Sequence, residues 1–405
     1  MFMAGLLLLQ GAGGAVAQER SSVSLNYKGS GGYSLVERTN LLRYDNGKYT
    51  GLTSREVRSF ISPAPYPSDL PQNAPEKEER WYDGNFYVLE QTKRAGANAA
   101  GGIHDSIPSE FRISENGILT MITDNGFPSY RSFPTFTQEK IFPGAQWQGT
   151  AERAVDPLYK GKFTRLSMLV LYTFVGEEIY RDKEVYRLTA EWQTNYGGSH
   201  TDPAGDSELL KAGGGHKADI LVLKSTCEPI LIIDKVDETF FYRDKSQVRF
   251  QGTISLFTEF PPAVERERLR PALNRVSAAA EKNNVAVEET SAGLRLSLRN
   301  IQFKPDSDEL LESEYARLDD IAEILKLAPG SQFLVEGHTA RAGDIATEKP
   351  LSQKRARKIA EELSKRGVNQ SAFLVRGWGG DRPIAGNDTE EGRALNRRVE
   401  ITILE

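Results

Sequence analysis

Cysteine and histidine are scarce in this chain of 405 residues, which contains one cysteine and four histidines. A single cysteine forms no internal disulfide, so the stability of the fold has to come from packing. Free cysteine packs as a small apolar side chain, and Cys227 is therefore predicted to be a buried or strand-end residue. The histidines are scattered without the spacing of metal ligands, so we expect no metal and no other cofactor; they are His104, His200, His216 and His338.

Positive charge is not in excess either, because 51 Lys and Arg stand against 56 Asp and Glu, for a net charge of −5. A mildly acidic chain lacks the basic footprint of nucleic-acid binding, so no nucleic-acid partner is expected. After the first residues, no stretch reaches the roughly 18 apolar residues of a membrane helix, so the mature chain is predicted to have no transmembrane helix. Neither a phosphate loop nor a catalytic nucleophile is evident, so the chain is not expected to be an enzyme; a hydrolase is the alternative.

A short apolar run does open the chain, MFMAGLLLLQGAGGAVAQ, and it ends with the small residues Ala15-Val16-Ala17. This pattern is typical of a secretory signal peptide, although a basic n-region is missing, which leaves open a start upstream of Met1. We predict a signal peptide over residues 1–17 and a place in the periplasm or cell envelope, with outer-membrane association left open. A retained apolar N-terminus is the alternative.

Two β-rich regions follow, an irregular one over residues 18–145 and a more regular antiparallel one over 146–260. In the stretch 165–175 both alternating sets of side chains are apolar, which is typical of a strand buried on both faces, so a sandwich-like fold is predicted. An outer-membrane barrel is the alternative. The glycine-rich segment 195–217 is interpreted as a long loop. We expect residues 18–260 to contact other envelope proteins, and 261–284 to be a helical linker.

From residue 285 onward, strands alternate with amphipathic helices. Strands are predicted over 294–303, 332–336, 372–376 and 398–404, and a helix carries the apolar stripe Leu311, Tyr315, Leu318, Ala322 and Leu325. A second helix is predicted to begin with Ser352 as its N-cap and to end before Gly367. The pattern indicates an α+β domain over 285–405, of βαβαβ type, with its helices on one face of a small mixed sheet.

Short motifs succeed one another in this block: Asn300-Ile301-Gln302-Phe303 with Leu310, Gly337-His338-Thr339 with Gly343, Leu351-Ser352, Arg355-Ala356, Leu363 with Gly367, Arg376-Gly377-Trp378-Gly379, Pro383, and Asn396-Arg397-Arg398-Val399-Glu400. In order and spacing, they resemble the OmpA C-terminal-like domain shared by OmpA, Pal and MotB. The resemblance covers roughly residues 285–405 and leaves the first 260 residues outside. Together with the β-rich regions, the chain also resembles spirochaete-type envelope proteins.

The resemblance implies non-covalent binding of peptidoglycan at the diamino acid of its stem peptide, a zwitterion that calls for an anion and a cation. In the family, the anion is the aspartate of a T-D-x-x-G turn and the cation is the arginine of L-S-x-x-R-A. Arg355 supplies the cation here, but Ala340 stands where the aspartate is expected. Since a methyl group cannot accept a hydrogen bond, roughly 1.5–3 kcal/mol of binding energy is expected to be lost.

Two acids close in sequence, Asp344 and Glu348, are candidates to supply a substitute carboxylate. The candidate ligand-binding residues are therefore Thr339, Ala340, Asp344, Glu348, Arg355 and Arg398. The alternatives for Arg355 are a solvated surface arginine, or one that pairs with a nearby acid and ties its helix down. Arg398 either lines the same binding groove or braces the last strand against acids of a helix. The predicted function is peptidoglycan binding in the envelope. The alternative is a divergent domain that no longer binds the wall and serves as a protein scaffold.

Overall fold

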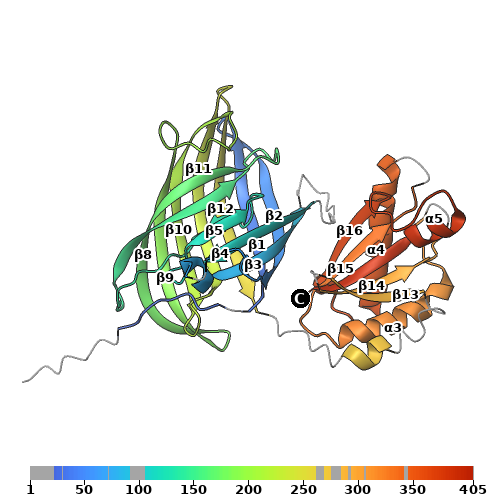
Figure 1. Ribbon diagram of the computed structural model, residues 1–405. Helices are drawn as coiled ribbons and strands as arrows, with labels where there is room; N and C mark the ends of the chain where they lie inside the picture. Colours follow the sequence, from blue (N-terminus) through green and yellow to red (C-terminus); the bar gives the residue numbers. More distant parts are fainter. Residues whose placement is uncertain are drawn as a thin grey trace, which may run out of the picture.

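The computed structural model describes residues 22–29, 31–71, 73–91, 105–260, 269–274, 284–290, 293–304, 307–341 and 345–404. Two sheets, each with its own apolar core, organise these residues (Figure 1). In the ranges described, no helix is both long and apolar enough to cross a membrane. The predicted signal peptide lies outside these ranges.

The first sheet has twelve strands in the order β5-β4-β3-β2-β1-β12-β11-β10-β9-β8-β7-β6, and the paired strands are antiparallel. A short 3-10 helix, η1 (Pro75–Glu78), precedes the third strand. The strands are β1 (Tyr33–Asp45), β2 (Lys48–Pro63), β3 (Arg80–Gln91), β4 (Asp105–Ile113), β5 (Leu119–Thr123), β6 (Tyr130–Arg131), β7 (Gln146–Val155), β8 (Thr164–Tyr180), β9 (Lys183–Tyr196), β10 (Leu209–Leu223), β11 (Pro229–Tyr242) and β12 (Gln247–Glu259).

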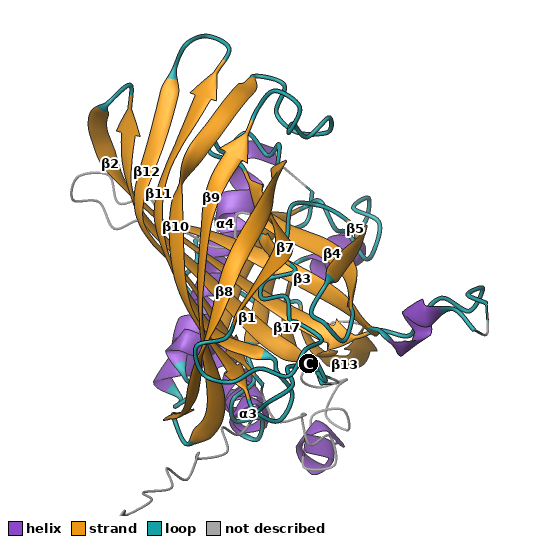
Figure 2. Ribbon diagram, turned by 90° about the vertical axis from the view of Figure 1, so that its left-hand side faces the viewer, coloured by secondary structure: helices purple, strands orange, loops and turns teal. Residues whose placement is uncertain are grey.

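This sheet curls until its two edges nearly meet, which makes it barrel-like (Figures 1 and 2). Ser132, which follows β6, bridges the edges, because its Oγ accepts a hydrogen bond from the Leu119 amide at 3.0 Å and donates one to the Leu119 carbonyl at 3.3 Å. Edge strands with free backbone groups are prone to pair with other chains, and the curl brings these two edges together instead.

The prediction of two regions with a sandwich-like fold is therefore wrong. Strands from both predicted regions belong to one sheet, and β1 pairs with β12 across the whole length of the region. The error lies in the second set of apolar side chains on β8: Leu169, Leu171 and Val175 are 60%, 38% and 46% exposed on the outer surface. Only the alternate set, which includes Val170 and Tyr172, is buried inside.

The interior of the first sheet is filled mainly by apolar and aromatic side chains, and it also holds a cluster of charged groups. Arg153 pairs with Glu238, and His216 Nδ1 lies 2.8 Å from Asp234 Oδ2. Trp192 stacks on the His216 ring with 4.5 Å between centroids. Buried charges are costly unless they are paired, and the cluster satisfies this condition among its own members.

The second sheet has five strands in the order β13-β14-β17-β15-β16, in which only β15 and β16 run parallel, so it is mixed as predicted. Its elements are β13 (Val285–Thr290), β14 (Gly293–Arg299), η2 (Glu312–Glu314), α3 (Tyr315–Lys326), β15 (Phe333–His338), α4 (Ile345–Lys365), η3 (Gln370–Ala372), β16 (Phe373–Gly379), α5 (Glu390–Asn396) and β17 (Arg398–Leu404). The α+β class is confirmed for this block.

Helices α3 and α4 pack on the same face of the second sheet, where Val335 and Ile401 meet Leu318, Ile359 and Leu363 in one core. Residues 269–274, the described part of the predicted linker, are helical, and Leu269 and Ala272 join this core. Gly367 has a φ of +90°, which suits a glycine just after the end of α4, as predicted.

The helix-free face of the second sheet is turned toward the first sheet (Figure 1). Tyr87 of β3 and Phe60 of β2 pack there against Leu334, Leu374 and Leu404. A hydrogen bond from Arg58 Nη1 to the Ser371 carbonyl, at 2.9 Å, adds to this contact. The α/β domain therefore uses one face for its own helices and the other for the barrel-like sheet.

Candidate functional site

The candidate site forms where β15 and β16 end beside the first turns of α4. The Thr339 amide donates to the Gly379 carbonyl at 2.9 Å, which continues the contact between the two strands beyond their ends. The Arg341 amide donates to Asn387 Oδ1 at 3.1 Å. These bonds fix the backbone on both sides of Ala340, which is itself 8% exposed.

Ser352 connects α4 to this corner of the sheet, but not as the predicted N-cap. Helix α4 begins at Ile345, so Ser352 lies inside it, and the predicted start of this helix is wrong. Pro350 disfavours a helical interior, which is why the sequence indicates a later start. The Ser352 hydroxyl donates to the Lys349 carbonyl and accepts from the Gly379 amide, both at 2.8 Å.

Gly337 of β15 allows α4 to lie close to the strand. A Cβ atom at Gly337 would lie 2.1 Å from the Ser352 carbonyl oxygen, a distance that no side chain tolerates. The sheet and the helix therefore meet backbone to backbone at the candidate site.

Glu348 faces the turn that contains Ala340. It is 8% exposed, and a Cβ atom built on Gly380 would lie 2.9 Å from Glu348 Oε2 and 3.1 Å from Arg341 Cβ. The carboxylate and the residue after Ala340 thus flank the same small space. The other candidate acid, Asp344, lies outside the described residues.

Arg355 lies two turns further along α4, on the same helical face as Glu348, because residues seven positions apart share a face. Their backbones are separated by about 10 Å along the axis. Arg355 Nε donates to the Ser307 carbonyl at 3.0 Å, and its guanidinium lies 4.9 Å from the centre of the Phe303 ring. These contacts hold the cation against the segment that follows β14.

Arg398 lies on the helix-free face of the sheet, away from this group. It is 3% exposed, its Nε is 2.6 Å from Glu400 Oε1, and its Nη2 donates to the Arg382 carbonyl at 3.1 Å. Beside it, burial and the charges of Arg398, Arg382 and Arg295 lower the pKa of His338 to about 3, so this imidazole is neutral at pH 7. The structure thus groups Thr339, Ala340 and Glu348, and separates them from Arg398.

Trp378 also lies on the helix-free face. Its indole donates to Glu336 Oε1 at 2.6 Å, and the guanidinium carbons of Arg376 and Arg382 lie 3.5 and 3.4 Å from the ring centre. Two groups at such short distances from one ring centre have to lie on opposite faces. Since both faces are covered, the ring is a packing residue and has no face left for stacking on a sugar.

Residues 302–397, which contain the candidate site, match the OmpA family by sequence. The C-terminal block is an OmpA family domain. The prediction from the motifs is thereby confirmed for this part of the chain.

Relatives of the OmpA family domain occur in several bacteria. Outer membrane porin F of Pseudomonas aeruginosa is 36% identical over 105 residues, which cover 26% of this chain and 30% of the porin. The peptidoglycan-binding protein ArfA of Mycobacterium tuberculosis is 39% identical over 103 residues, which cover 25% of this chain and 32% of ArfA. An outer membrane protein from Borrelia burgdorferi B31, of known structure, is 38% identical; the match covers 30% of this chain and 97% of that protein, with a TM-score of 0.26.

The chain spans about a third of the length of the two curated relatives. Those relatives are named as a porin and a peptidoglycan-binding protein, not as enzymes. Outer membrane proteins are prominent among the relatives, so the predicted place in the periplasm or cell envelope is confirmed at that level.

Asn396 is a residue of the OmpA family domain whose role the sequence did not reveal. It is fully buried, and its amide oxygen accepts from the backbone amides of Ile384 and Ala385 at 2.8 and 3.0 Å, while its amide nitrogen donates to the Ala385 carbonyl at 2.8 Å. It thereby holds the loop that carries Asn387 against Arg341. The Asn396-Arg397-Arg398 motif was the available signal for this asparagine.

Proposed function

We propose that this chain is an envelope protein that binds peptidoglycan non-covalently through its OmpA family domain, with Glu348 supplying the carboxylate that Ala340 cannot. The observation that carries this proposal is the position of the Glu348 carboxylate, which shares the space around Gly380 with Arg341. The name of ArfA, a relative by this same domain, supports peptidoglycan as the ligand.

The chemistry of the stem peptide fits this arrangement. A diamino acid presents an ammonium and a carboxylate, and charge-assisted hydrogen bonds to such groups are stronger than neutral ones. Glu348 would accept from the ammonium, and Arg355 would donate to the carboxylate through its planar fork. Arg355 and Glu348 lie on one face of α4, so both would contact the same ligand.

The low exposure of the site restricts how the ligand would enter. Ala340 and Glu348 are each 8% exposed, so only a small terminal group of the peptide would reach them. An ammonium group at the end of a side chain has this size. Alanine in place of aspartate would leave room for it beside Glu348.

The first sheet is proposed to serve contacts with other envelope proteins. Its outer surface carries exposed apolar side chains on β8, of which Ile179 is 76% exposed. Contacts made there would leave the candidate site of the OmpA family domain accessible.

Sedimentation of the full chain with purified peptidoglycan sacculi tests the proposal. Arg355→Ala is expected to weaken binding about ten-fold or more, since it removes one charge-assisted contact. Arg187→Ala is the matched control, because that arginine is 43% exposed on the outer face of β9, pairs with Asp219, and is expected to leave binding unchanged.

Two results would contradict the proposal. Wild-type protein that stays in the supernatant would favour the scaffold alternative, in which the domain no longer binds the wall. Binding that persists unchanged in Arg355→Ala would exclude this arginine from the site.

A further inference from the structure

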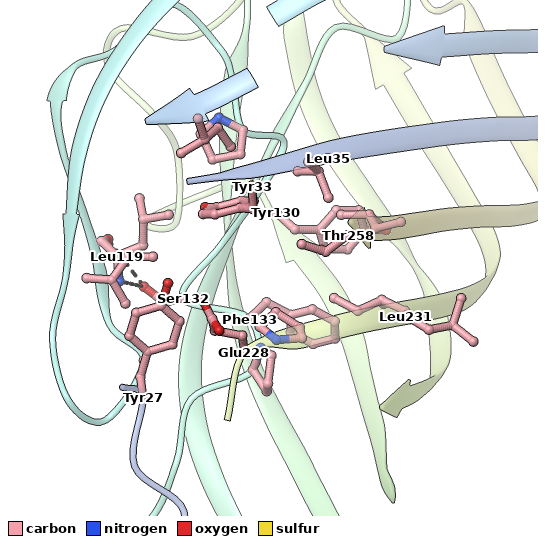
Figure 3. Close-up of a pocket in the computed structure, with 18 of the residues that line it drawn as sticks. Tyr27, Tyr33, Leu35, Leu119, Tyr130, Ser132, Phe133, Glu228, Leu231 and Thr258 are labelled. Carbon is pink, nitrogen blue, oxygen red and sulfur yellow. Dashed lines mark hydrogen bonds between the residues drawn. The ribbon is translucent and has the colours of Figure 1, made fainter. Parts of the chain in front are cut away.

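A cavity of about 90 Å³ lies at one end of the barrel-like sheet, outside the OmpA family domain (Figure 3). The segment 22–29 crosses this end, held by hydrogen bonds from the Tyr27 amide to the Glu115 carbonyl at 2.6 Å and from the Lys28 amide to the Thr226 carbonyl at 2.8 Å. A single water needs roughly 10–15 Å³ of such space, so the cavity has room for several waters or for a small organic molecule.

Aromatic rings dominate the lining. Tyr27, Tyr33, Tyr130 and Phe133 converge on the cavity, the last two from one segment of the chain (Figure 3). The Tyr130 and Phe133 rings pack with 5.5 Å between their centroids, which holds that part of the wall in place. Aromatic faces carry negative potential and attract cations.

One acidic side chain, Glu228, enters this aromatic lining. It is 6% exposed, and its Oε2 accepts a hydrogen bond from the Thr226 hydroxyl at 2.7 Å. Its Oε1 is buried and has no hydrogen-bond partner among the described residues. Figure 3 shows the carboxyl group between Tyr27 and Phe133, directed into the cavity.

Within the described ranges, no lysine, arginine or histidine forms an ion pair with the Glu228 carboxylate, whose side-chain partner is the Thr226 hydroxyl. Gly29 passes alongside, and a side chain at this position has no room beside Oε1, because its Cβ atom would overlap with the oxygen. Burial raises the pKa of Glu228, against the opposing hydrogen bond from Thr226.

A buried carboxyl group without a counter-charge is costly, and a fold that only needed packing would place an apolar residue there. A neutral apolar ligand would leave Oε1 without a partner, and an anion would be repelled. We propose that this cavity binds a small organic ammonium, with Glu228 as its counter-charge and the rings of Tyr27, Tyr33, Tyr130 and Phe133 around its apolar part.

Calorimetric titration of the full chain with three probes of similar length tests this site: n-butylammonium, n-butanol and butyrate. The ammonium is expected to bind about ten-fold more tightly than the alcohol, because it alone forms a charge-assisted bond with Glu228. Butyrate is expected to bind least of the three.

Glu228→Gln keeps the size of the side chain and removes its charge, so the preference for the ammonium over the alcohol should disappear. Because a neutral amide is less costly to bury, this variant is expected to fold and to melt at the same temperature as wild type or above it. Glu191→Gln is the matched control: Glu191 pairs with Lys217 on the outer surface and its loss should leave the preference intact.

Three results would overturn the proposal. They are equal affinity for the ammonium and the alcohol, an unchanged preference in a folded Glu228→Gln variant, and no binding of n-butylammonium up to about 10 mM. None of them bears on the wall-binding site, because the cavity is lined only by residues of the first 260.

Discussion

At the scale of single residues, the protonation of His338 is determined by the charged groups on the helix-free face of the OmpA family domain. The Glu400 carboxylate lies 3.7 Å from His338 Nε2, but it already pairs with Arg398 at 2.6 Å and so does not hold a proton on the imidazole. Burial, with the charges of Arg398, Arg382 and Arg295, lowers the pKa of His338 to about 3.

This pKa predicts a loss of stability in acid. Between pH 6.5, the ordinary pKa of histidine, and about pH 3, the unfolded chain binds a proton at this position and the folded chain does not. Stability contributed by the neutral imidazole is therefore complete above pH 6.5 and falls as the pH drops through that window, by up to about 1.4 kcal/mol per pH unit. Urea unfolding of the full chain at pH 7 and pH 4 measures it.

His338→Gln is expected to reduce this dependence on pH, since glutamine does not titrate. His200→Gln, which changes an exposed histidine of the first sheet, is the control and should keep the wild-type dependence. The assignment fails if both variants lose stability in acid as steeply as the wild type.

The sequence located part of the site at this scale and missed part of it. Ala340 could be identified directly, because its position in the Gly-His-Thr motif is fixed by neighbours in the chain. The side of the sheet on which Arg398 lies could not be identified from the sequence. It depends on how β17 pairs with β15, where Arg398 lies opposite His338. A one-residue change of register would place the arginine on the other face.

At the scale of elements, the seating of α4 on β15 is the contact that shapes the site. Gly337→Ala is expected to displace the helix, because the new Cβ would lie 2.1 Å from the Ser352 carbonyl oxygen. Overpacking of this kind costs about 1–3 kcal/mol or more, so both the unfolding temperature and wall binding should fall.

Gly386→Ala is the matched control for this glycine, because its Cβ would meet only Asp388 Oδ2, at 3.7 Å. Differential scanning calorimetry of the two variants gives the comparison. If Gly337→Ala melts like Gly386→Ala, the helix does not lie against the strand as described.

The elements themselves were partly predictable. The strand over 398–404 was predicted with its observed bounds, since apolar residues alternate with polar ones after the double arginine. The start of α4 at Ile345 was not predicted, because Pro350 indicates a break in the helix that tertiary contacts override. The glycines 213–215 were interpreted as loop but lie in β10, where a Cβ on Gly214 would be 2.2 Å from the Asp237 carbonyl of β11.

At the scale of the whole molecule, the contact between the two sheets fixes the orientation of the OmpA family domain. Tyr87 is 3% exposed, because Leu334, Leu374 and Leu404 cover its ring. Tyr87→Ser should remove most of this apolar contact and let the domains separate, with a larger radius of gyration in small-angle X-ray scattering.

Tyr49→Ser is the control for size and chemistry, because Tyr49 is 53% exposed on β2 and touches neither the second sheet nor its helices in the described structure. An unchanged radius of gyration in Tyr87→Ser would show that the orientation does not depend on this contact.

The barrel-like closure could not be predicted from local sequence. Alternation of apolar residues indicates strands but not their partners, and the pairing of β1 with β12 joins segments about 200 residues apart. The outward-facing apolar residues of β8 favoured a strand buried on both faces, and hence a sandwich-like fold. An exposed leucine cannot be distinguished from a buried one in a sequence.

The central claim is that Glu348 replaces the aspartate absent at position 340, and a double-mutant cycle of peptidoglycan affinity tests it most directly. In the wild-type background, Glu348→Gln is expected to weaken binding about ten- to a hundred-fold. In the Ala340→Asp background, the same change should have little effect, because the restored aspartate supplies the carboxylate. Equal losses in both backgrounds, or no loss in either, would contradict the claim.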